Sequence, residues 1–457
     1  MSLRAIVLAA GKGTRMRSGR PKVLHTLCGR PMLWWVLRAL RELAIDELVV
    51  VTSADLAPQL AALAADAGVA QAVAALQEPQ LGTGDATRVA LERLAPRDGT
   101  VLVLNGDMPL VELELVRRTL AACDGAGALV TARLESPGSF GRIVRRGERV
   151  ERIVEARDAS AAERAIDEIN AGLYAFREPG LREALERLGR ENAQREYYLT
   201  DVVAHFARSG APLAAVVAEE PNAVLGVNDR IELAAARALL GRRLCEAHMR
   251  AGTTIVDPET TYLEPDLELA PDATIYPNTA IRGKSVVGAS AEIGPNTRLD
   301  GARIGAFAVV TESVIVASTI GDYAQVGPYA HLRNGTTVGT AARIGNFVEI
   351  KASQLAPGVR AGHLTYLGDS EVGERSNVGA GTITCNFDGE RKHRTTIGKD
   401  AFIGSNSSLV APLVIGDGAL TGAGSVVTRD VPAGARVAGN PARPLAPKPP
   451  DASPERS

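Results

Sequence analysis

The sequence predicts an α/β domain with a mostly parallel, Rossmann-like sheet, followed by a C-terminal left-handed parallel β-helix. Three observations support this fold class. The chain has 457 residues, more than one ordinary hydrophobic core accommodates. Its first half alternates short apolar runs with amphipathic stretches, as α/β proteins do. Its second half repeats an apolar residue at every sixth position, which is the period of a hexapeptide-repeat β-helix.

Four apolar runs in the first 229 residues are typical of buried strands, and helical stretches lie between them. They cover residues 5–9, 48–51, 101–104 and 128–131. Open parallel sheets bind ligands beyond the carboxyl ends of their strands. The glycine-rich segment after Ala9, and Gly106 and Asp107 after Leu104, are therefore expected to form a binding site.

The hexads of the second half carry large aliphatic residues separated by small or polar ones. The series includes Leu263, Leu269, Ile275, Ile281, Val287, Ile293, Leu299, Ile320, Val326, Leu332, Val338, Ile344, Ile350, Ile397, Ile403, Leu409 and Ile415. This period predicts coils with three short faces, each with one apolar side chain pointing inside. The period fails around residues 355–366 and 382–396, where we expect loops that leave the wall.

Between the two patterns, residues 228–249 predict a connecting helix, capped by Asn228 or Asp229 and ended near Gly252. Four parts are therefore expected. They are an α/β domain over residues 1–229, a linker helix over 230–250, the β-helix over 251–443 and a disordered tail over 444–457. The tail is rich in proline and charge, which does not favour a packed core.

The charges of the chain nearly cancel, with 51 basic and 53 acidic side chains and a net charge of −2. This balance argues against nucleic-acid binding and against binding to anionic membranes. The four cysteines lie far apart in the sequence and predict reduced thiols in the cytoplasm. The apolar run at residues 5–10 is too short for an export signal, and no stretch reaches membrane-spanning length.

Residues 8–16 (LAAGKGTRM) follow the first predicted strand and predict a phosphate-binding turn. Gly11 and Gly13 allow backbone N–H groups to approach a triphosphate closely. Arg15 and Lys22 supply positive charge that can offset a departing phosphate. The segment is not a P-loop because the Gly-Lys-Ser/Thr ending is absent, and it lacks the third glycine of a dinucleotide fingerprint. Asp107, at the end of an apolar strand, can supply an oxygen ligand to Mg²⁺.

Further segments occur in the order expected for sugar-nucleotide pyrophosphorylases. They are residues 81–84 (LGTG), 104–110 (LNGDMPL), 140–142 (FGR), 154–155 (VE), 168–172 (EINAG), 196–201 (EYYLTD) and 226–228 (GVN). With the β-helix, they make nearly the whole chain resemble one family. Its members are bifunctional uridylyltransferases and acetyltransferases that make UDP-N-acetylglucosamine.

The resemblance implies that residues 1–229 form a nucleotidyltransferase domain that binds UTP, N-acetylglucosamine-1-phosphate and Mg²⁺. Asp107 and Asn228 would bind the metal, and Arg15 and Lys22 would act in catalysis. Gln77, Gly82 and Thr83 would hold the uracil base, and Gly141, Glu155 and Asn170 would hold the amino sugar. The complete implied nucleotide and sugar site is Leu8, Ala9, Ala10, Gly11, Lys22, Gln77, Gly82, Thr83, Asn105, Gly106, Asp107, Gly141, Glu155, Asn170 and Asn228.

A second candidate site lies where the hexad period fails, in residues 363–369 (HLTYLGD). Acetyl transfer from a thioester to an amine needs a base near neutral pH, and His363 is suited to that task. Arg333 and Lys351 directly follow inward hexad residues, at places where small residues are common. Such long cations predict an anionic partner such as a sugar phosphate, although a surface ladder of charges would also place them there.

The family's acetyltransferase motif implies that His363 is the base and that four residues bind glucosamine-1-phosphate. These four are Arg333, Lys351, Tyr366 and Asn377. The residues implied for acetyl-CoA are Ala380, Asn386, Phe387, Ser405, Ala423 and Arg443. Phe387 replaces a tyrosine common in the family and loses a hydroxyl contact. Residues 438–443 (AGNPAR) look more like the ending of other hexapeptide acetyltransferases, so Arg443 is only a candidate for the last coenzyme-binding cation.

Two other functions remain open from the sequence. A sugar-1-phosphate nucleotidyltransferase with a non-catalytic β-helix would not need the segment around His363. A non-catalytic scaffold would not need Arg15, Lys22 and Asp107 together. For assembly we expect a homotrimer, because flat solenoid walls pack side by side and a threefold ring closes such a contact. The family resemblance implies the same trimer.

Overall fold

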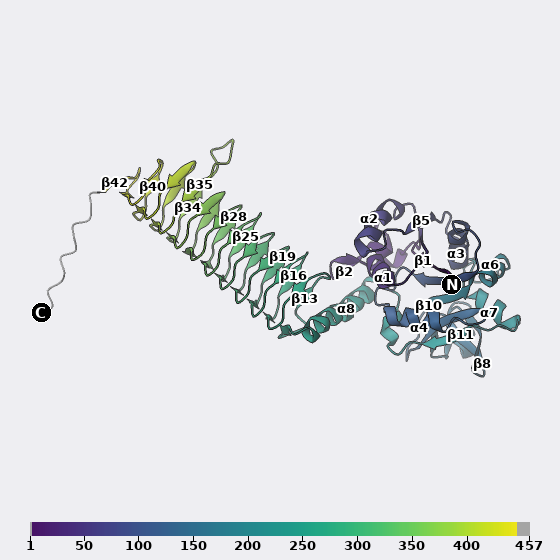
Figure 1. Cartoon of the computed structure of the whole chain (residues 1–457). Coiled ribbons are helices and arrows are strands. Elements are labelled where there is room, and N and C mark those ends of the chain that lie inside the picture. Colours follow the sequence, from purple (N-terminus) through teal and green to yellow (C-terminus); the bar gives the residue numbers. More distant parts are fainter. Residues whose placement is uncertain (1, 446–457) are drawn as a thin grey trace. The chain divides into compact units, whose positions relative to one another are not determined.

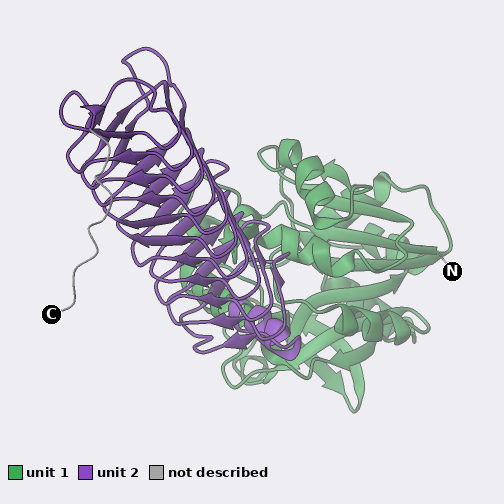
Figure 2. Cartoon of the chain, turned by 60° about the vertical axis from the view of Figure 1, so that its left-hand side comes forward, with its two compact units in different colours: residues 1–240 green, residues 241–457 purple. Residues whose placement is uncertain are grey.

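The chain folds as an α/β unit, a long helix and a stack of short-stranded coils (Figure 1). The computed structural model describes residues 2–445, and the chain divides into two compact units, residues 1–240 and 241–457 (Figure 2). Of the tail expected to be disordered, residues 446–457 lie outside the described residues. Residue Pro444 belongs to a strand and pairs with Val437.

The first unit contains one mixed sheet whose strand order is β11-β7-β10-β6-β1-β4-β5, with β8 and β9 as an added hairpin. The strands are β1 (Ser2–Leu8), β4 (Glu47–Thr52), β5 (Val73–Leu76), β6 (Gly99–Asn105), β7 (Gly127–Arg133), β8 (Arg142–Arg146), β9 (Arg149–Val154), β10 (Glu168–Arg177) and β11 (Ala214–Val217). A separate two-stranded sheet pairs β2 (Thr26–Leu27) with β3 (Arg30–Pro31). Strand β10 runs antiparallel to β6 and β7, whereas the β1–β4, β1–β6, β4–β5 and β7–β11 pairs are parallel. The four strands expected from the sequence are present as β1, β4, β6 and β7.

Helices cover both faces of this sheet. They are α1 (Met32–Leu40), α2 (Ala57–Ala67), α3 (Thr83–Glu92), α4 (Leu113–Ala121), α5 (Ala161–Arg164), α6 (Glu178–Glu186) and α7 (Asp201–Arg208), with 3-10 turns η1 (Thr14–Met16), η2 (Lys22–Leu24) and η3 (Pro221–Val224). Successive strand residues point to opposite faces. Val7 therefore joins the core with α1, α2 and α4, while Ile6 joins the core with α3, α6 and α7. Burial on both faces explains why the strands are continuous apolar runs.

The second unit is a left-handed parallel β-helix with three sheets, as expected. One sheet contains β12 (Thr254–Ile255), β15 (Thr274–Ile275), β18 (Glu292–Ile293), β21 (Val309–Val310), β24 (Gln325–Val326), β27 (Arg343–Asn346), β30 (Arg360–His363), β33 (Asn377–Val378), β36 (Phe402–Ile403), β39 (Leu420–Thr421), β41 (Arg436–Ala438) and β42 (Arg443–Pro444). The second contains β13 (Tyr262–Leu263), β16 (Ala280–Arg282), β19 (Arg298–Asp300), β22 (Val314–Val316), β25 (His331–Arg333), β28 (Glu349–Lys351), β31 (Tyr366–Gly368), β34 (Ile383–Cys385), β37 (Ser408–Val410) and β40 (Val426–Val427). The third contains β14 (Glu268–Leu269), β17 (Val286–Val287), β20 (Arg303–Ile304), β23 (Thr319–Ile320), β26 (Thr337–Val338), β29 (Gln354–Leu355), β32 (Ser370–Val372), β35 (Thr395–Ile397) and β38 (Leu413–Ile415).

The inward hexad residues stack in register from coil to coil and are buried. Ile281, for example, pairs with Leu299 in the next coil, and neither is exposed. Backbone N–H and C=O groups of each coil bond to the coils on either side, so stacking satisfies them. The core is therefore one continuous apolar column.

The expected loop at residues 355–366 is wrong. Leu355, Ala361 and Leu367 keep the six-residue spacing and are all buried, and strands β29, β30 and β31 follow one another within regular coils. The period was hidden because the inward residue is alanine rather than a large aliphatic one. The second expected loop is confirmed: residues between β34 and β35 leave the wall, with an antiparallel bridge between Phe387 and Lys392 (Figure 1).

Helix α8 (Arg230–Arg250) matches the connecting helix expected at residues 228–249. Asp229 caps its start, because Oδ1 accepts hydrogen bonds from the backbone N–H groups of Ile231 and Glu232, both at 2.9 Å. Among residues 2–445, no helix is long and apolar enough to cross a membrane.

Candidate active sites

The first candidate site lies beyond the carboxyl ends of β1 and β6. The Gly106 N–H donates to the Leu8 carbonyl at 2.8 Å, and the Ala9 N–H donates to the Val51 carbonyl at 2.9 Å. These bonds hold the glycine-rich turn beside the end of β6. Gly13 has a φ of +58°, and a Cβ there would lie 2.6 Å from the Lys22 Cβ. Glycine at this position therefore lets Lys22 approach the turn.

Four polar side chains expected in the first site meet in this place. The Lys22 ammonium forms an ion pair with the Asp107 carboxylate and lies 3.3 Å from Asn228 Oδ1. The Arg15 guanidinium donates to the same Asn228 oxygen at 2.9 Å. The Val227 N–H donates to the Asp107 carbonyl at 2.9 Å, which fixes the segment that carries Asn228. Residues up to 213 positions apart in the sequence thus form one cationic and oxygen-rich cluster.

The donor set of this cluster suits a hard divalent cation. Asp107 and Asn228 offer one carboxylate and one amide oxygen, and Mg²⁺ commonly takes one or two protein carboxylates together with water and substrate phosphates. Among the described residues 2–445, there is no group of three or more His, Cys, Asp or Glu side chains arranged to hold a metal ion. A metal at Asp107 would therefore take most of its ligands from water and substrate phosphates.

Two adjoining hollows open at the cluster, with volumes of about 540 and 350 Å³. The larger is lined by the glycine-rich turn, Lys22, Gln77, Gly82 and Thr83. The smaller is lined by Gly141, Glu155 and Asn170, and Asp107 and Asn228 border both. Of the fifteen residues expected in the nucleotide and sugar site, only Gly106 lines neither hollow, because it packs beneath the turn, where a Cβ would lie 3.0 Å from Ala9 Cβ.

The buried amide side chain of Gln77 forms part of the wall of the larger hollow. Gln77 Nε2 donates to the Gly82 carbonyl at 3.0 Å and to the Asp85 carboxylate at 2.8 Å. These two bonds from Nε2 fix the amide group of Gln77, and therefore also fix the direction of its amide oxygen. Gln80 Nε2 donates to the Ala10 carbonyl at 3.0 Å and ties this region to the glycine-rich turn. Asp85 and Gln80 were not expected from the sequence, although they lie directly beside residues 81–84.

The smaller hollow combines hydrogen bonding with partial burial. Thr200 Oγ1 donates to Glu155 Oε1 at 3.1 Å, and Asn170 Nδ2 donates to the Tyr174 hydroxyl at 2.7 Å. Burial raises the pKa of the Glu155 carboxyl, and the nearby Asp201 adds to the rise by charge repulsion. A ligand that donates hydrogen bonds to Glu155 would stabilise its charged form.

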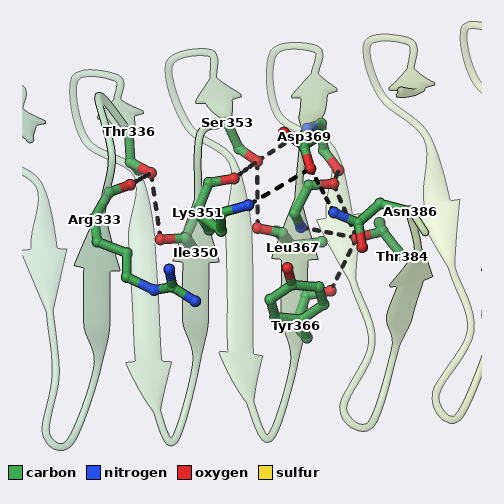
Figure 3. A network of polar contacts seen from close by, with 12 residues as sticks. Arg333, Thr336, Ile350, Lys351, Ser353, Tyr366, Leu367, Asp369, Thr384 and Asn386 are labelled. Atoms are coloured by element: carbon green, nitrogen blue, oxygen red, sulfur yellow. Dashed lines mark hydrogen bonds and ion pairs between the residues drawn. The ribbon is translucent and has the colours of Figure 1, made fainter. Parts of the chain in front are cut away.

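The second candidate site lies on the sheet formed by β25, β28, β31 and β34 (Figure 3). Arg333, Lys351 and Gly368 occupy equivalent positions in successive coils, and Glu349 and Tyr366 form the adjacent column. These side chains point outward because the inward position is taken by Leu332, Ile350 and Leu367. The structure thus brings Arg333, Lys351 and Tyr366 together on one face.

Both expected cations already have acidic neighbours in the chain. Arg333 donates to Glu349 Oε1 from Nε at 3.0 Å and from Nη2 at 2.5 Å. Lys351 Nζ is 4.0 Å from Asp369 Oδ2, beyond hydrogen-bond distance. An external anion is therefore not required to explain Arg333, whereas the Lys351 side chain is 11% exposed and its ammonium can still take a closer partner. Side chains alternate between the two faces of a strand, so Glu349 lies on the same face of β28 as Lys351. This alternation could have predicted from the sequence that Glu349 lies beside the cations.

Gly368 creates room for the neighbouring side chains of this face. A Cβ there would lie 2.4 Å from the Tyr366 hydroxyl and 2.7 Å from Asn386 Nδ2. Asn386 Nδ2 donates to Asp369 Oδ2 at 2.5 Å, which links it to the carboxylate near Lys351 (Figure 3). The absence of a side chain at Gly368 therefore leaves room for the Tyr366 hydroxyl and for the Asn386 amide that is bonded to Asp369. The sequence motif of residues 363–369 contains Asp369 but does not predict this role for it.

His363 ends β30 on an edge of the β-helix, and its imidazole is exposed. Its Nδ1 lies 2.5 Å from Asn346 Oδ1. The inward residues of β30, β33, β36 and β39 pair in register. His363 lies two positions after the inward residue of its strand, and three expected acetyl-CoA residues lie at the same position after the other strands, in one column with His363. They are Ala380, Ser405 and Ala423. Asn377 lies on β33, the strand that pairs with β30.

The remaining expected residues are more peripheral. Phe387 is exposed at the start of the loop between β34 and β35. Arg443 is exposed in β42, two strands beyond β39, which precedes Ala423 in the His363 column. On the same loop as Phe387, the nearby Lys351 ammonium lowers the pKa of Lys392. Lys392 was not expected from the sequence to belong to the site, and it adds a further cation close to Lys351.

Known families match both halves of the chain. Residues 5–208 match the MobA-like NTP transferase domain, and residues 317–352 and 394–429 match the bacterial transferase hexapeptide (six repeats). Fold, sites and these matches define the class: a fused transferase with a nucleotidyltransferase domain and a hexapeptide-repeat transferase domain.

Relatives over almost the full length identify the family. The chain is 45% identical to the bifunctional protein GlmU of Trichlorobacter lovleyi, over 94% of each chain. It is 46% identical to bifunctional protein GlmU of Mycobacterium sp. (strain KMS), over 94% of this chain and 88% of the relative. It is 43% identical to the Geobacillus sp. (strain WCH70) protein of the same name, over 94% and 93%. The chain belongs to the bifunctional GlmU family.

Proposed function

We propose that this chain makes UDP-N-acetylglucosamine in two steps at two separate sites. The β-helix transfers an acetyl group from acetyl-CoA to glucosamine-1-phosphate. The α/β domain then transfers UMP from UTP to N-acetylglucosamine-1-phosphate and releases pyrophosphate. The observation that carries the proposal is the presence, on one chain of this family, of both the Asp107 cluster and the His363 face.

In uridylyl transfer, the sugar phosphate oxygen attacks the α-phosphorus of UTP and pyrophosphate leaves. Arg15 and Lys22 neutralise charge as it develops on the departing phosphates. Gln77, Gly82 and Thr83 hold the base, with the turn of residues 8–11 beside the phosphates. Asn105 and Gly106 complete the wall, and Gly141, Glu155 and Asn170 orient the sugar. Asp107 and Asn228 hold Mg²⁺, which supplies charge neutralisation on the phosphate oxygens.

In acetyl transfer, the sugar amine attacks the thioester carbonyl, the C–N bond forms and the C–S bond breaks. His363 accepts the proton lost by the amine and returns it to the sulfur, so that coenzyme A leaves as the thiol and His363 is neutral again. Arg333, Lys351, Tyr366 and Asn377 hold the sugar phosphate. The column of Ala380, Ser405 and Ala423, with Asn386 and Phe387, supplies the small and polar surface for acetyl-CoA, and Arg443 is a candidate for its phosphate.

The domain that performs uridylyl transfer spans residues 1–229. The helix over residues 230–250 connects it to the acetyltransferase domain of residues 251–443. The enzyme acts in the cytoplasm on small molecules, without nucleic-acid or membrane partners. Its acidic and basic residues nearly balance, which supports this part of the proposal.

The functional unit is a homotrimer in which β-helices border one another's acetyl sites. An edge of the β-helix supports this, because three successive corner residues are apolar and exposed: Tyr329 by 54%, Phe347 by 56% and Leu364 by 64%. The rings of Tyr329 and Phe347 stack with centroids 5.2 Å apart. Leu364 directly follows His363. An apolar ridge beside the base suits contact with a second copy of the chain.

One coupled assay tests the proposed function. Purified protein is given glucosamine-1-phosphate, acetyl-CoA, UTP and Mg²⁺, and products are identified by mass spectrometry. We expect UDP-N-acetylglucosamine, pyrophosphate and free coenzyme A. Omission of acetyl-CoA should stop formation of the acetylated product. A nucleotide sugar formed without any consumption of acetyl-CoA would favour a single-activity nucleotidyltransferase with a non-catalytic β-helix.

A further inference from the structure

We infer that Asn346 is a positioning residue for His363: its amide oxygen keeps a proton on Nδ1 and leaves Nε2 free to accept a proton from the sugar amine. This inference rests on the proposed role of His363 as the base of acetyl transfer. It adds a residue that neither the sequence motif nor the comparisons select.

The backbone brings the two side chains together. Strands β27 and β30 pair in parallel, and their register places Asn346 opposite His363. Each strand has four residues, whereas β24 and β33 on either side have two. The pairing therefore continues past the inward residues Ile344 and Ala361 to the edge of the β-helix.

Gly345 permits this local extension. A Cβ at Gly345 would lie 1.9 Å from the Gly362 carbonyl oxygen, so no other residue fits at position 345 without moving the strands apart. The close approach places Asn346 Oδ1 2.5 Å from His363 Nδ1. Asn346 is partly buried while the imidazole is exposed, so the strand anchors the acceptor and orients the ring.

The contact has a chemical direction. A neutral imidazole has one donor and one acceptor nitrogen, and a carboxamide oxygen can only accept. Nδ1 must therefore carry the proton, and the lone pair of Nε2 points to the outer side of the ring. A general base needs that lone pair free. A histidine without this partner would divide between two tautomers, only one of which presents Nε2 as a base.

Few charged groups compete with this arrangement. The ionisable side chains on the two paired strands are Arg343 and Arg360, and β33 carries none. Tyr366 begins the next strand of the same coil. Within residues 2–445, His363 has no ion-pair partner, so the Asn346 amide is the polar group that orients it.

Three variants separate positioning from structural support. Asn346→Ala should lower kcat of acetyl transfer about ten- to hundredfold, with KM values for both substrates changed little, because the substrates do not rely on Asn346. Asn346→Asp keeps an acceptor of the same shape and should retain most of the wild-type rate at high pH. Its carboxylate stabilises the imidazolium, so the acidic limb of kcat/KM should move to higher pH. Asn346→Leu should behave like the alanine variant.

A direct readout complements the kinetics. The method is ¹⁵N NMR of histidine-labelled protein, with His363→Gln as the assignment control. In the wild type, neutral His363 should be protonated at Nδ1. In Asn346→Ala, it should shift towards a mixture of the two tautomers. Uridylyl transfer should stay at the wild-type rate in all variants, which reports an intact chain. The inference is overturned if Asn346→Asp loses as much activity as Asn346→Ala, or if the alanine variant keeps the wild-type rate. If His363→Ala itself keeps normal acetylation, the proposed function of His363 fails instead.

Discussion

In the cluster at Asp107, the ammonium group of Lys22 lies where a bound metal ion would be expected. In the chain alone, the Lys22 ammonium contacts Asp107 and approaches Asn228 Oδ1 at 3.3 Å. These are the two side chains that we propose as metal ligands. Lys22 thus holds the oxygen atoms together, while also competing with a cation for them.

Lys22→Met should separate these two effects. Removing the ammonium should lower uridylyl transfer about a hundredfold, since charge on the departing phosphates is no longer offset. The same change should tighten binding of Mn²⁺, used in place of Mg²⁺ without nucleotide, because Asp107 no longer has an internal cation. Titration of the metal by calorimetry or by electron paramagnetic resonance measures this affinity. Lys12→Met, which removes an exposed cation of the same turn, should leave Mn²⁺ affinity unchanged. Unchanged affinity in Lys22→Met would argue against the competition.

Glu155 gives a prediction about pH. Burial raises its pKa in the folded chain, so the folded state holds a proton at pH values where the unfolded state has released it. Stability must therefore fall as pH rises from the ordinary pKa of glutamate through the raised value. Glu155→Gln should remove this contribution and raise the Tm of the ligand-free N-terminal unit at pH 7 by about 2 °C or more.

Calorimetric scans between pH 4 and pH 7 measure the effect, as the difference between variant and wild type. The same variant should raise KM for N-acetylglucosamine-1-phosphate about tenfold, because a charged acceptor of sugar hydroxyl groups is lost. A Tm difference that is constant over the whole pH range would contradict a titrating Glu155.

At the scale of elements, regular coils continue on both sides of the loop between β34 and β35. Strand β34 pairs with β31 and β37, and β35 pairs with β32 and β38. The loop is therefore an addition to the wall rather than part of it. It carries Lys392, which interacts with Lys351.

Replacing residues 387–393 by a short Gly-Ser turn should leave the Tm of the β-helix nearly unchanged, because the pairings of both flanking strands remain. Acetyl transfer should show KM values raised about tenfold, since the loop no longer borders the Lys351 face. Scanning calorimetry and steady-state kinetics measure the two quantities, with uridylyl transfer as the internal control. Loss of the folding transition of the β-helix would show instead that the loop is structural.

How far the sequence predicts the structure depends on the kind of pattern. The six-residue period predicts the β-helix because the inward side chains of successive coils must stack. At Ala361 the period is hard to recognise, because the inward residue is small, and the sequence therefore predicts a loop where a regular coil is present. Ala361 is nevertheless fully buried. Motif residues such as Asp107 and Lys351 are predictable from their neighbours in the sequence. Asn346 is not, because its partner lies 17 residues away and only the register of the coils brings the two together.

At the scale of the whole molecule, the apolar edge formed by Tyr329, Phe347 and Leu364 is exposed in the single chain. Tyr329→Asp should weaken self-association, because a carboxylate would be buried at the subunit contact. Sedimentation velocity should then show monomers at concentrations where the wild type forms the proposed trimer, with acetyl transfer reduced. Ile231→Asp, at a residue that is 82% exposed in α8, should sediment as the wild type does. A Tyr329→Asp protein that remains trimeric would exclude this edge from the contact.

The central claim is that one chain carries two independent active sites, and the most direct test assays both activities in two single variants. Asp107→Asn should lose uridylyl transfer about a hundredfold or more and keep acetyl transfer. His363→Ala should lose acetyl transfer about a hundredfold or more and keep uridylyl transfer. An equimolar mixture of the two should again convert glucosamine-1-phosphate to UDP-N-acetylglucosamine, through N-acetylglucosamine-1-phosphate released by one protein and used by the other. Equal loss of both activities in either variant would contradict the account.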